Sequence, residues 1–258
     1  MDQLTAGTGA GSAGTAGSAP GTLAAAWQAV SGQQPPPPLW ALASAAAVAL
    51  YLVCDLRAWL LVRHVVTLAH EGGHAGVALL CGRRVRGVRL HSDTSGLTLS
   101  SGRPTGPGMV ATGAAGYLAP SVLGLFAAAW LGTGHVVATL CAFLALLAAI
   151  AVAVRNPFGV VSVAVTAGVL VVVTVWAPDS LRSAFAFALA WFLLLAGPRP
   201  VVELQRKRHR GQAPTSDADQ LARLTGLPGL FWVGVFLLLT LGMAAGGGYL
   251  LLLSTGLV

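Results

Sequence analysis

Charged residues are scarce in this chain of 258 residues, where Asp, Glu, Lys and Arg together make up 9%. A soluble domain carries about 25% charged residues, and without them a fold of this size cannot cover its surface with groups that bind water. Hydrophobic residues make up 55%, and the mean hydropathy is +0.76. This composition excludes an ordinary soluble enzyme, a disordered protein and a nucleic-acid-binding protein. It predicts a polytopic membrane protein in a lipid bilayer.

Large apolar residues are nearly absent from residues 1–34, which consist mainly of Ala, Gly, Ser and Thr. Such a segment buries too little surface to fold, and the prolines at 35–38 form a stiff spacer after it. Residues 1–38 are therefore predicted to be a disordered tail, and residues 39–258 the membrane domain.

Apolar runs of about 20 residues, the length that crosses a bilayer, fill most of the membrane domain. They predict an all-α fold with about six or seven transmembrane helices. The junction at Cys54–Arg57 is either a tight interfacial turn or a polar interruption of one long helix. The expected spans are 39–55, 58–81, 108–131, 134–154, 158–177, 181–197 and 229–254.

Basic residues lie mainly in three connections between these spans: 83–103, the position of Arg155, and a basic loop at 198–227. Cytoplasmic loops are enriched in Lys and Arg. The arginine-rich side is therefore expected to be cytoplasmic. With seven spans in the cell membrane, the N-terminal tail would also be cytoplasmic and the C-terminus external.

Residues 83–103 differ from the rest of the chain because apolar and polar residues alternate there on both sides of a turn-type cluster, 91–95. Alternation with a period of two indicates strands. We expect a membrane-associated β-hairpin, the one sheet of the protein.

Glutamate occurs only twice, at Glu71 and Glu203, and the first of these lies in the sequence His70-Glu71-Gly72-Gly73-His74. This is an HExxH motif inside the helix expected at 58–81. Its histidines share one helix face, where they can bind one metal ion. Zn²⁺ is the natural ion, since it accepts nitrogen ligands and keeps a fourth position for water in catalytic sites. Glu71 is predicted to be the general base.

Chance is a poor explanation of this motif, because the chain's own His and Glu frequencies give it a probability of about 0.001. An ionisable residue inside a membrane helix also costs about 2.5–3.5 kcal/mol on insertion scales. The alternative reading of the motif is a polar packing cluster between helices. Glu203, beside a basic run, is expected to be a solvated surface charge.

The HExxH helix, the hairpin that follows it and the small residues of Ala114-Ala115-Gly116-Tyr117 together resemble the site-2 protease family of intramembrane zinc metalloproteases. The resemblance implies that His70 and His74 are zinc ligands and that Glu71 is catalytic. It also implies that the substrate is a single-span membrane protein. An extended substrate segment would add to the hairpin, around Val85, Val88 and Leu97.

An Asp-Gly pair, which supplies the third zinc ligand in that family, is absent from the chain. The segment Arg155-Asn156-Pro157-Phe158-Gly159 retains the Asn, Pro and Gly of the family pattern without the Asp. The motif helix is expected to end on the cytoplasmic side of the membrane. Among side chains expected on that side, Asp217 is the first candidate for the third ligand, and Asp219 and Asn156 are the alternatives. Ser216 or Asp217 also suits the N-cap of a short helix.

Three functions remain open at this point. The first is an intramembrane zinc metalloprotease. The second is a non-catalytic scaffold or chaperone that retains the fold, which the missing Asp-Gly pair favours. The third is a transporter that uses His70, Glu71 and His74 as an ion or proton site, although no inverted repeat supports it. The oligomeric state cannot be read from the sequence.

Overall fold

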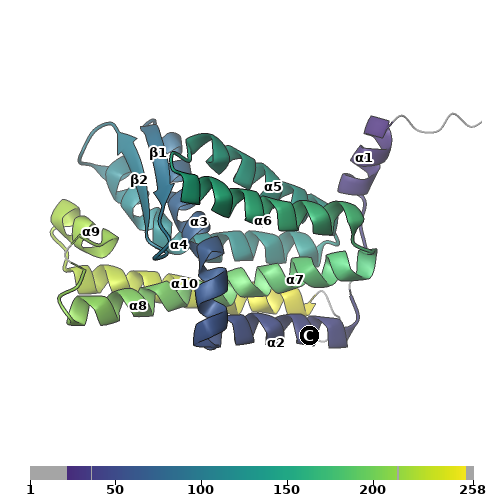
Figure 1. The fold of residues 1–258 in the computed structure, drawn as a ribbon. Helices are drawn as coiled ribbons and strands as arrows, with labels where there is room; N and C mark the ends of the chain where they lie inside the picture. Colours follow the sequence, from purple (N-terminus) through teal and green to yellow (C-terminus); the bar gives the residue numbers. More distant parts are fainter. Residues whose placement is uncertain (1–21, 36, 214, 254–258) are drawn as a thin grey trace, which may run out of the picture.

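The computed structural model describes residues 22–35, 37–213 and 215–253. Over these residues the chain is helical apart from one two-stranded sheet (Figure 1). This confirms the expected all-α fold with a single hairpin. The helices are α1 (Thr22–Ser31), α2 (Leu39–Cys54), α3 (Leu56–Leu80), α4 (Pro107–Gly132), α5 (Val136–Ala153), α6 (Pro157–Trp176), α7 (Asp179–Ala196), α8 (Pro198–His209), α9 (Asp217–Thr225) and α10 (Gly229–Leu253).

Helices α2 and α3 meet at an angle of 98°. Asp55 causes this break, because its extended backbone (φ −71°, ψ 131°) cannot continue α2. Its carboxylate then accepts a hydrogen bond of 2.8 Å from the amide of Ala58 and caps the start of α3. Of the two arrangements open for this junction, the structure therefore has the turn.

Seven separate spans are not found. Among the described residues, five helices are long and apolar enough to cross a membrane, or six if the bent pair α2–α3 counts as one span. Helix α2 has only 16 residues, which is short for a bilayer. The expected count of about six or seven spans thus agrees with six, in which the first two apolar runs are two arms of one bent pair.

The region expected to be a basic loop, 198–227, is mostly helical. Gly197 has α-helical backbone angles, so α8 continues α7. The N-terminal tail also contains a helix, α1, where disorder was expected. Residues 1–21 of that tail lie outside the described residues.

The hairpin consists of β1 (Arg84–Leu90) and β2 (Gly96–Ser101), paired antiparallel with a bulge between Val85 and Gly87. The other edge of β1 is covered, because the amide of Arg155 donates to the carbonyl of Val88 at 2.9 Å. The inner side chains of β1, Val88 and Leu90, are buried together with Leu68, Ala75, Ile150, Val154 and Val163. This cluster attaches the hairpin firmly to the helices.

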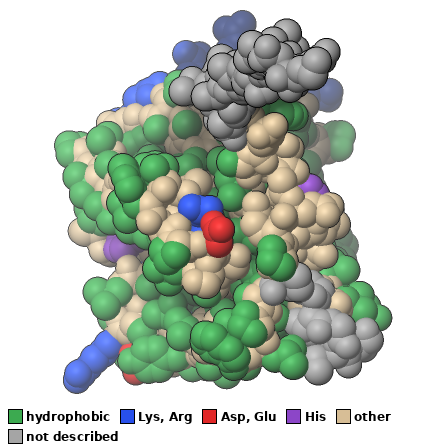
Figure 2. Space-filling model, turned by 90° about the vertical axis from the view of Figure 1, so that its right-hand side faces the viewer, with side chains coloured by type: hydrophobic (Ala, Val, Ile, Leu, Met, Phe, Trp, Pro, Cys, Tyr) green, Lys and Arg blue, Asp and Glu red, His purple; other side chains and the backbone are tan. Residues whose placement is uncertain are grey.

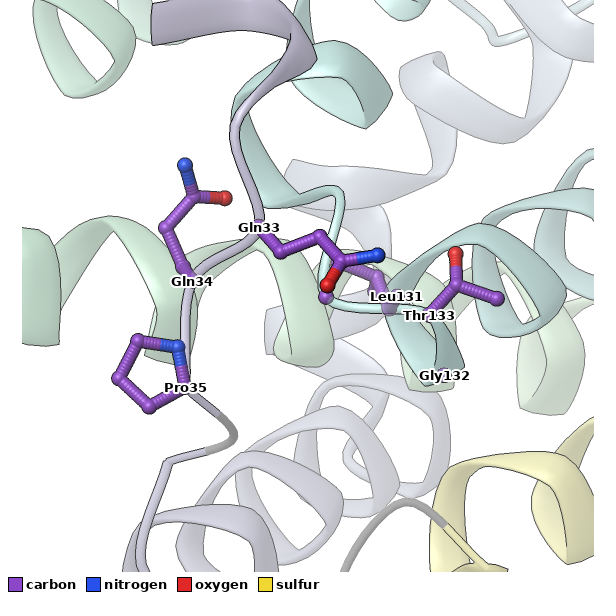
Figure 3. Close-up of a pocket in the computed structure, with 7 residues that line it drawn as sticks. Gln33, Gln34, Pro35, Leu131, Gly132 and Thr133 are labelled. Atoms are coloured by element: carbon purple, nitrogen blue, oxygen red, sulfur yellow. The ribbon is translucent and has the colours of Figure 1, made fainter.

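The segment before α2 lies against the turn between α4 and α5, as the close-up in Figure 3 shows. The amide of Gln34 donates to the carbonyl of Gly134 at 2.8 Å, and the Gln34 side-chain oxygen accepts from the amide of Val136 at 3.0 Å. Figure 1 places this turn and α1 at the opposite end of the molecule from the hairpin and α9. The N-terminal segment and the arginine-rich connections therefore lie at opposite ends of the molecule.

That end of the molecule carries few charges, as Figure 2 shows for the described side chains. Three tryptophans with 37–75% of their surface exposed lie at helix ends there: Trp40 at the start of α2, Trp130 near the end of α4 and Trp176 at the end of α6. Tryptophan is enriched where helices leave the hydrocarbon core. The hairpin, α8 and α9 form the opposite, basic end.

Candidate metal and catalytic site

Helix α3 brings two imidazoles together. The Nε2 atoms of His70 and His74 are 3.1 Å apart, and the two rings meet edge to face at 84°. His74 is buried and His70 is half-buried. The four-residue spacing of the helix places both rings on one face, as the motif predicts.

The carboxylate of Asp217, at the start of α9, completes a triangle with these nitrogens. Its Oδ2 lies 3.2 Å from the Nε2 of His70 and 3.2 Å from the Nε2 of His74. A tetrahedral zinc ion with bonds of about 2.0–2.1 Å separates its ligand atoms by about 3.3–3.4 Å. The observed edges of 3.1–3.2 Å are close to that separation, so these three side chains can hold such an ion.

Asp217 is held in its charged form by the same contacts. Burial raises the pKa of its carboxyl group, but the hydrogen bonds that His70 and His74 donate when their Nε2 atoms are protonated outweigh this and lower the pKa below its ordinary value. An ionised carboxylate is the form that binds a metal ion.

The backbone of α4 orients His74. Its Nδ1 lies 2.7 Å from the carbonyl oxygen of Thr112. A carbonyl only accepts, so Nδ1 carries the proton, and in the neutral ring Nε2 keeps a free lone pair. A partner of this kind is typical of histidines that bind metals.

Gly116 on α4 leaves the space next to the histidines open. A Cβ at this position would lie 2.6 Å from the Cε1 of His74 and 2.7 Å from the Cε1 of His70. Any larger residue would therefore enter the space beside the two rings. Tyr117, the next residue, packs edge-on against His70 with ring centroids 4.8 Å apart.

Glu71 is buried, with 4% of its surface exposed, and lies under the hairpin. The hydroxyl of Thr98 on β2 donates to the Glu71 Oε2 at 2.5 Å. Gly96 on the same strand contacts the carboxylate so closely that a Cβ there would collide with it. The hairpin thus fixes the position of this carboxylate.

The two alternative ligands have other roles. Asn156 uses both ends of its amide on β1: its oxygen accepts from the amide of Leu90 at 3.1 Å, and its nitrogen donates to the carbonyl of Leu90 at 2.6 Å. Asp219 accepts hydrogen bonds from Ser216 and Arg208. Neither side chain joins the three-atom group of His70, His74 and Asp217.

The suggested substrate contacts on the hairpin differ in exposure. Val88 is fully buried at 0% and packs into the core, so its side chain is not accessible to a substrate. Val85 is half-buried, and Leu97 on β2 is 47% exposed. Leu97 is therefore the accessible one of the three.

Glu203 is not a solvated surface charge as expected. It is half-buried and accepts from Arg63 on α3 and from Arg199 on α8, both at 3.3 Å. The guanidinium of Arg199 also lies 4.4 Å from the ring centroid of Trp59. Sequence reasoning missed these contacts because one partner of Glu203, Arg63 on α3, lies 140 residues away in the chain.

Thr98 and Thr112 are site residues that sequence reasoning missed. Both act through contacts between distant segments. The alternation of 96–100 was a usable signal for Thr98, because it placed residues 96, 98 and 100 on one face of the strand.

A family model described as Peptidase M50B-like matches residues 42–247, most of the chain. The chain belongs to this family. The match confirms the resemblance to the site-2 protease family and covers the HExxH helix, the hairpin and α9. Comparisons with curated proteins and with solved structures found no match. The family is one of membrane peptidases, which agrees with the apolar helices of the fold.

Proposed function

We propose that the protein is an intramembrane zinc metallopeptidase that hydrolyses peptide bonds of membrane-protein substrates. The observation that carries this proposal is the triangle of two histidine nitrogens and one carboxylate oxygen, with edges of 3.1–3.2 Å, beside a buried glutamate. Membership of a peptidase family supports the same conclusion.

In this proposal His70, His74 and Asp217 hold the metal, and the other residues prepare the site. A bound zinc ion supplies Lewis-acid chemistry, polarising the scissile carbonyl and acidifying the attacking water. Glu71 accepts the proton of that water and donates it to the leaving amine. Thr98 keeps the Glu71 carboxylate in place, and Thr112 keeps the His74 ring in the tautomer that binds metal.

Substrate access is proposed along the hairpin. A transmembrane helix must first unwind, because its carbonyls are hydrogen-bonded within the helix. An extended segment can pair with the edge of a sheet. The outer edge of β1 is covered by the chain at Val154–Asn156, which favours the outer edge of β2, near Leu97. The proposed substrate class is the single-span membrane protein.

We place the basic end of the molecule in the cytoplasm and the protein in the cell membrane. The arginines of the hairpin and of α8 support this orientation, because cytoplasmic loops carry an excess of Lys and Arg. The N-terminal segment at Gln34 then faces the outer side, like the end of α10. This proposal differs from the cytoplasmic N-terminal tail expected with seven spans.

Metal analysis combined with two substitutions tests the function. The purified protein is expected to contain about one zinc per chain, and His70→Ala is expected to lose it. Glu71→Gln should retain zinc but leave a single-span reporter uncleaved in the membrane. His135→Ala is the matched control, since His135 is a half-buried residue just before α5 that contacts Thr133 and lies outside the group of His70, His74 and Asp217.

Absence of zinc from the wild-type protein would contradict the proposal. Stoichiometric zinc together with equal reporter cleavage by wild type and Glu71→Gln would contradict the catalytic role of Glu71. Zinc with no cleavage of any membrane protein would instead favour the scaffold function, which the missing Asp-Gly pair suggested.

A further inference from the structure

Asp217, the carboxylate of the candidate metal site, lies on α9, a helix that is too short to be stable by itself. Helix α9 has nine residues, and isolated helices shorter than about 12 residues are marginal in water. The position of Asp217 therefore depends on how α9 is attached to its neighbours.

One attachment is apolar and lies along the buried face of α9. Ala218 and Leu221 are fully buried, at 0% exposure, among side chains of α8 and α10. Leu221 also fits against Gly113 of α4, where a Cβ would lie 3.2 Å from its Cδ2. These contacts hold the body of the helix and, through Ala218, part of its first turn. Polar groups beside Asp217 hold that turn as well.

The second attachment is polar and lies at that first turn. Arg208, in the last turn of α8, forms an ion pair with Asp219 and lies 3.4 Å from the Ser216 hydroxyl. Ser216 caps α9 by accepting from the amide of Asp219, and its hydroxyl donates to the Asp219 carboxylate at 2.6 Å. The Arg208 guanidinium also packs onto Gly229, the first residue of α10, so closely that a Cβ there would collide with it. One side chain thus connects α8, α9 and α10.

The two aspartates of α9 face different partners. Residues two apart on a helix are separated by about 200°, so the face that presents Asp219 to Arg208 turns Asp217 toward the histidines. Both ends of the Arg208–Asp219 pair are mostly buried, with 19% and 24% of their side-chain surface exposed. Solvent therefore screens this pair less than a surface ion pair.

We propose that Arg208 and Asp219 are positioning residues, which clamp the first turn of α9 so that Asp217 stays within metal-binding distance of His70 and His74. Asp217 takes the place of the ligand that the Asp-Gly pair supplies in the resembled family, and the clamp holds the helix that carries it. This inference rests on the proposed metal site.

Metal affinity of the full-length protein in detergent tests the clamp. The apoprotein is titrated with Zn²⁺ against a chromophoric chelator, for wild type, Arg208→Gln, Asp219→Asn and the double variant. Each single substitution is expected to weaken zinc binding about 10–100-fold, as for other residues that orient metal ligands. The double variant should bind about as well as the weaker single variant, because both changes remove one interaction. Arg206→Gln, an exposed arginine on the same helix, should bind like wild type.

An Asp217→Asn background separates positioning from general stability. If Arg208 acts through Asp217, adding Arg208→Gln to Asp217→Asn should cause no further loss of zinc affinity. The same 10–100-fold loss in both backgrounds would overturn the proposal, and so would unchanged affinity of Arg208→Gln in the wild-type background.

Hydrogen exchange of the metal-free protein tests the clamp without zinc. Amides of α9 should exchange about tenfold faster in Arg208→Gln than in wild type, while those of α4 and α10 keep their protection. Unchanged exchange of α9 would contradict the clamp. A wild-type protein that binds no zinc would refute the proposed function, yet this measurement would still decide whether Arg208 holds α9.

Discussion

At the scale of single residues, Gly116 has the most direct influence on the candidate site. It has no side chain, and the space next to its Cα is bordered by the rings of both histidines. The methyl group of alanine is enough to occupy that space. Small residues on membrane helices are usually explained by helix packing, but here the neighbour of the glycine is a pair of imidazoles.

Gly116→Ala is therefore expected to abolish stoichiometric zinc binding, because the new methyl group would push the histidine rings apart. The measurement is zinc content of the purified protein together with its circular dichroism. Gly76→Ala is the control, since nothing lies within 4 Å of a Cβ at that position. Normal zinc content in Gly116→Ala would show that the ion does not bind between these rings.

Thr98 is a second residue whose chemistry can be isolated. Thr98→Val keeps the shape of the side chain but removes the hydroxyl that donates to Glu71. Loss of a hydrogen bond to a charged group costs about 1.5–3 kcal/mol, so we expect reporter cleavage to slow about 10–100-fold. Zinc content should stay unchanged. Thr98→Ser should recover most of the rate, and a serine variant as slow as valine would argue against the hydroxyl.

At the scale of elements, the hairpin depends on Asn156. This residue follows α5 and precedes α6, yet its amide makes two hydrogen bonds to the backbone of Leu90. Leu90 pairs with Gly96, which in turn contacts Glu71. The Asn-Pro sequence that resembles part of a metal-ligand motif thus supports the sheet above the glutamate.

Asn156→Ala is expected to leave zinc content at about one per chain while the Leu90 amide exchanges faster with solvent. The physical reason is that Leu90 loses both of its side-chain partners, whereas the three ligand atoms keep theirs. Hydrogen exchange resolved to β1, with α5 as the internal reference, measures the first effect. Loss of zinc with unchanged exchange of β1 would instead mark Asn156 as a ligand.

At the scale of the whole molecule, charge and tryptophan mark opposite ends. The hairpin and α8, together with the residues that flank them, carry nine of the 14 arginines. Exposed tryptophans lie near the turn that contacts Gln34. The bent pair α2–α3 accounts for the side of the N-terminal segment. If the bent pair crosses the membrane once, the described chain has six spans. Because six is an even number, the N-terminal segment and the end of α10 then lie on the same side of the membrane.

Cysteine labelling in cells tests this arrangement. In a background without Cys54, Cys81 and Cys141, all of them free thiols, an impermeant maleimide should label Gln33→Cys in intact cells. It should label Arg210→Cys only after the membrane is opened. Both positions are exposed. The reverse pattern would contradict the proposed orientation, and labelling of both positions from one side would contradict the six-span reading.

The sequence by itself determined the class of the protein and half of the site. Scarcity of charge and runs of apolar residues are sufficient to predict a membrane protein, since the bilayer demands them. The pair of His70 and His74 follows from helix geometry, because contacts four residues apart are local. The alternating pattern likewise predicted the hairpin, since strand periodicity is a property of the chain itself.

Only the tertiary structure decided which contacts form between distant segments. Asp217 was preferred over Asp219 and Asn156, but composition and spacing could not distinguish them, because the direction of each side chain depends on how its segment docks. Asp217 approaches His74 across 143 residues of sequence, and Asp219 turns away toward Arg208. The break at Asp55 also required the structure. The sequence does not show whether the residues on either side of Asp55 form two membrane spans or one bent pair, and the proposed side of the N-terminal segment depends on that difference.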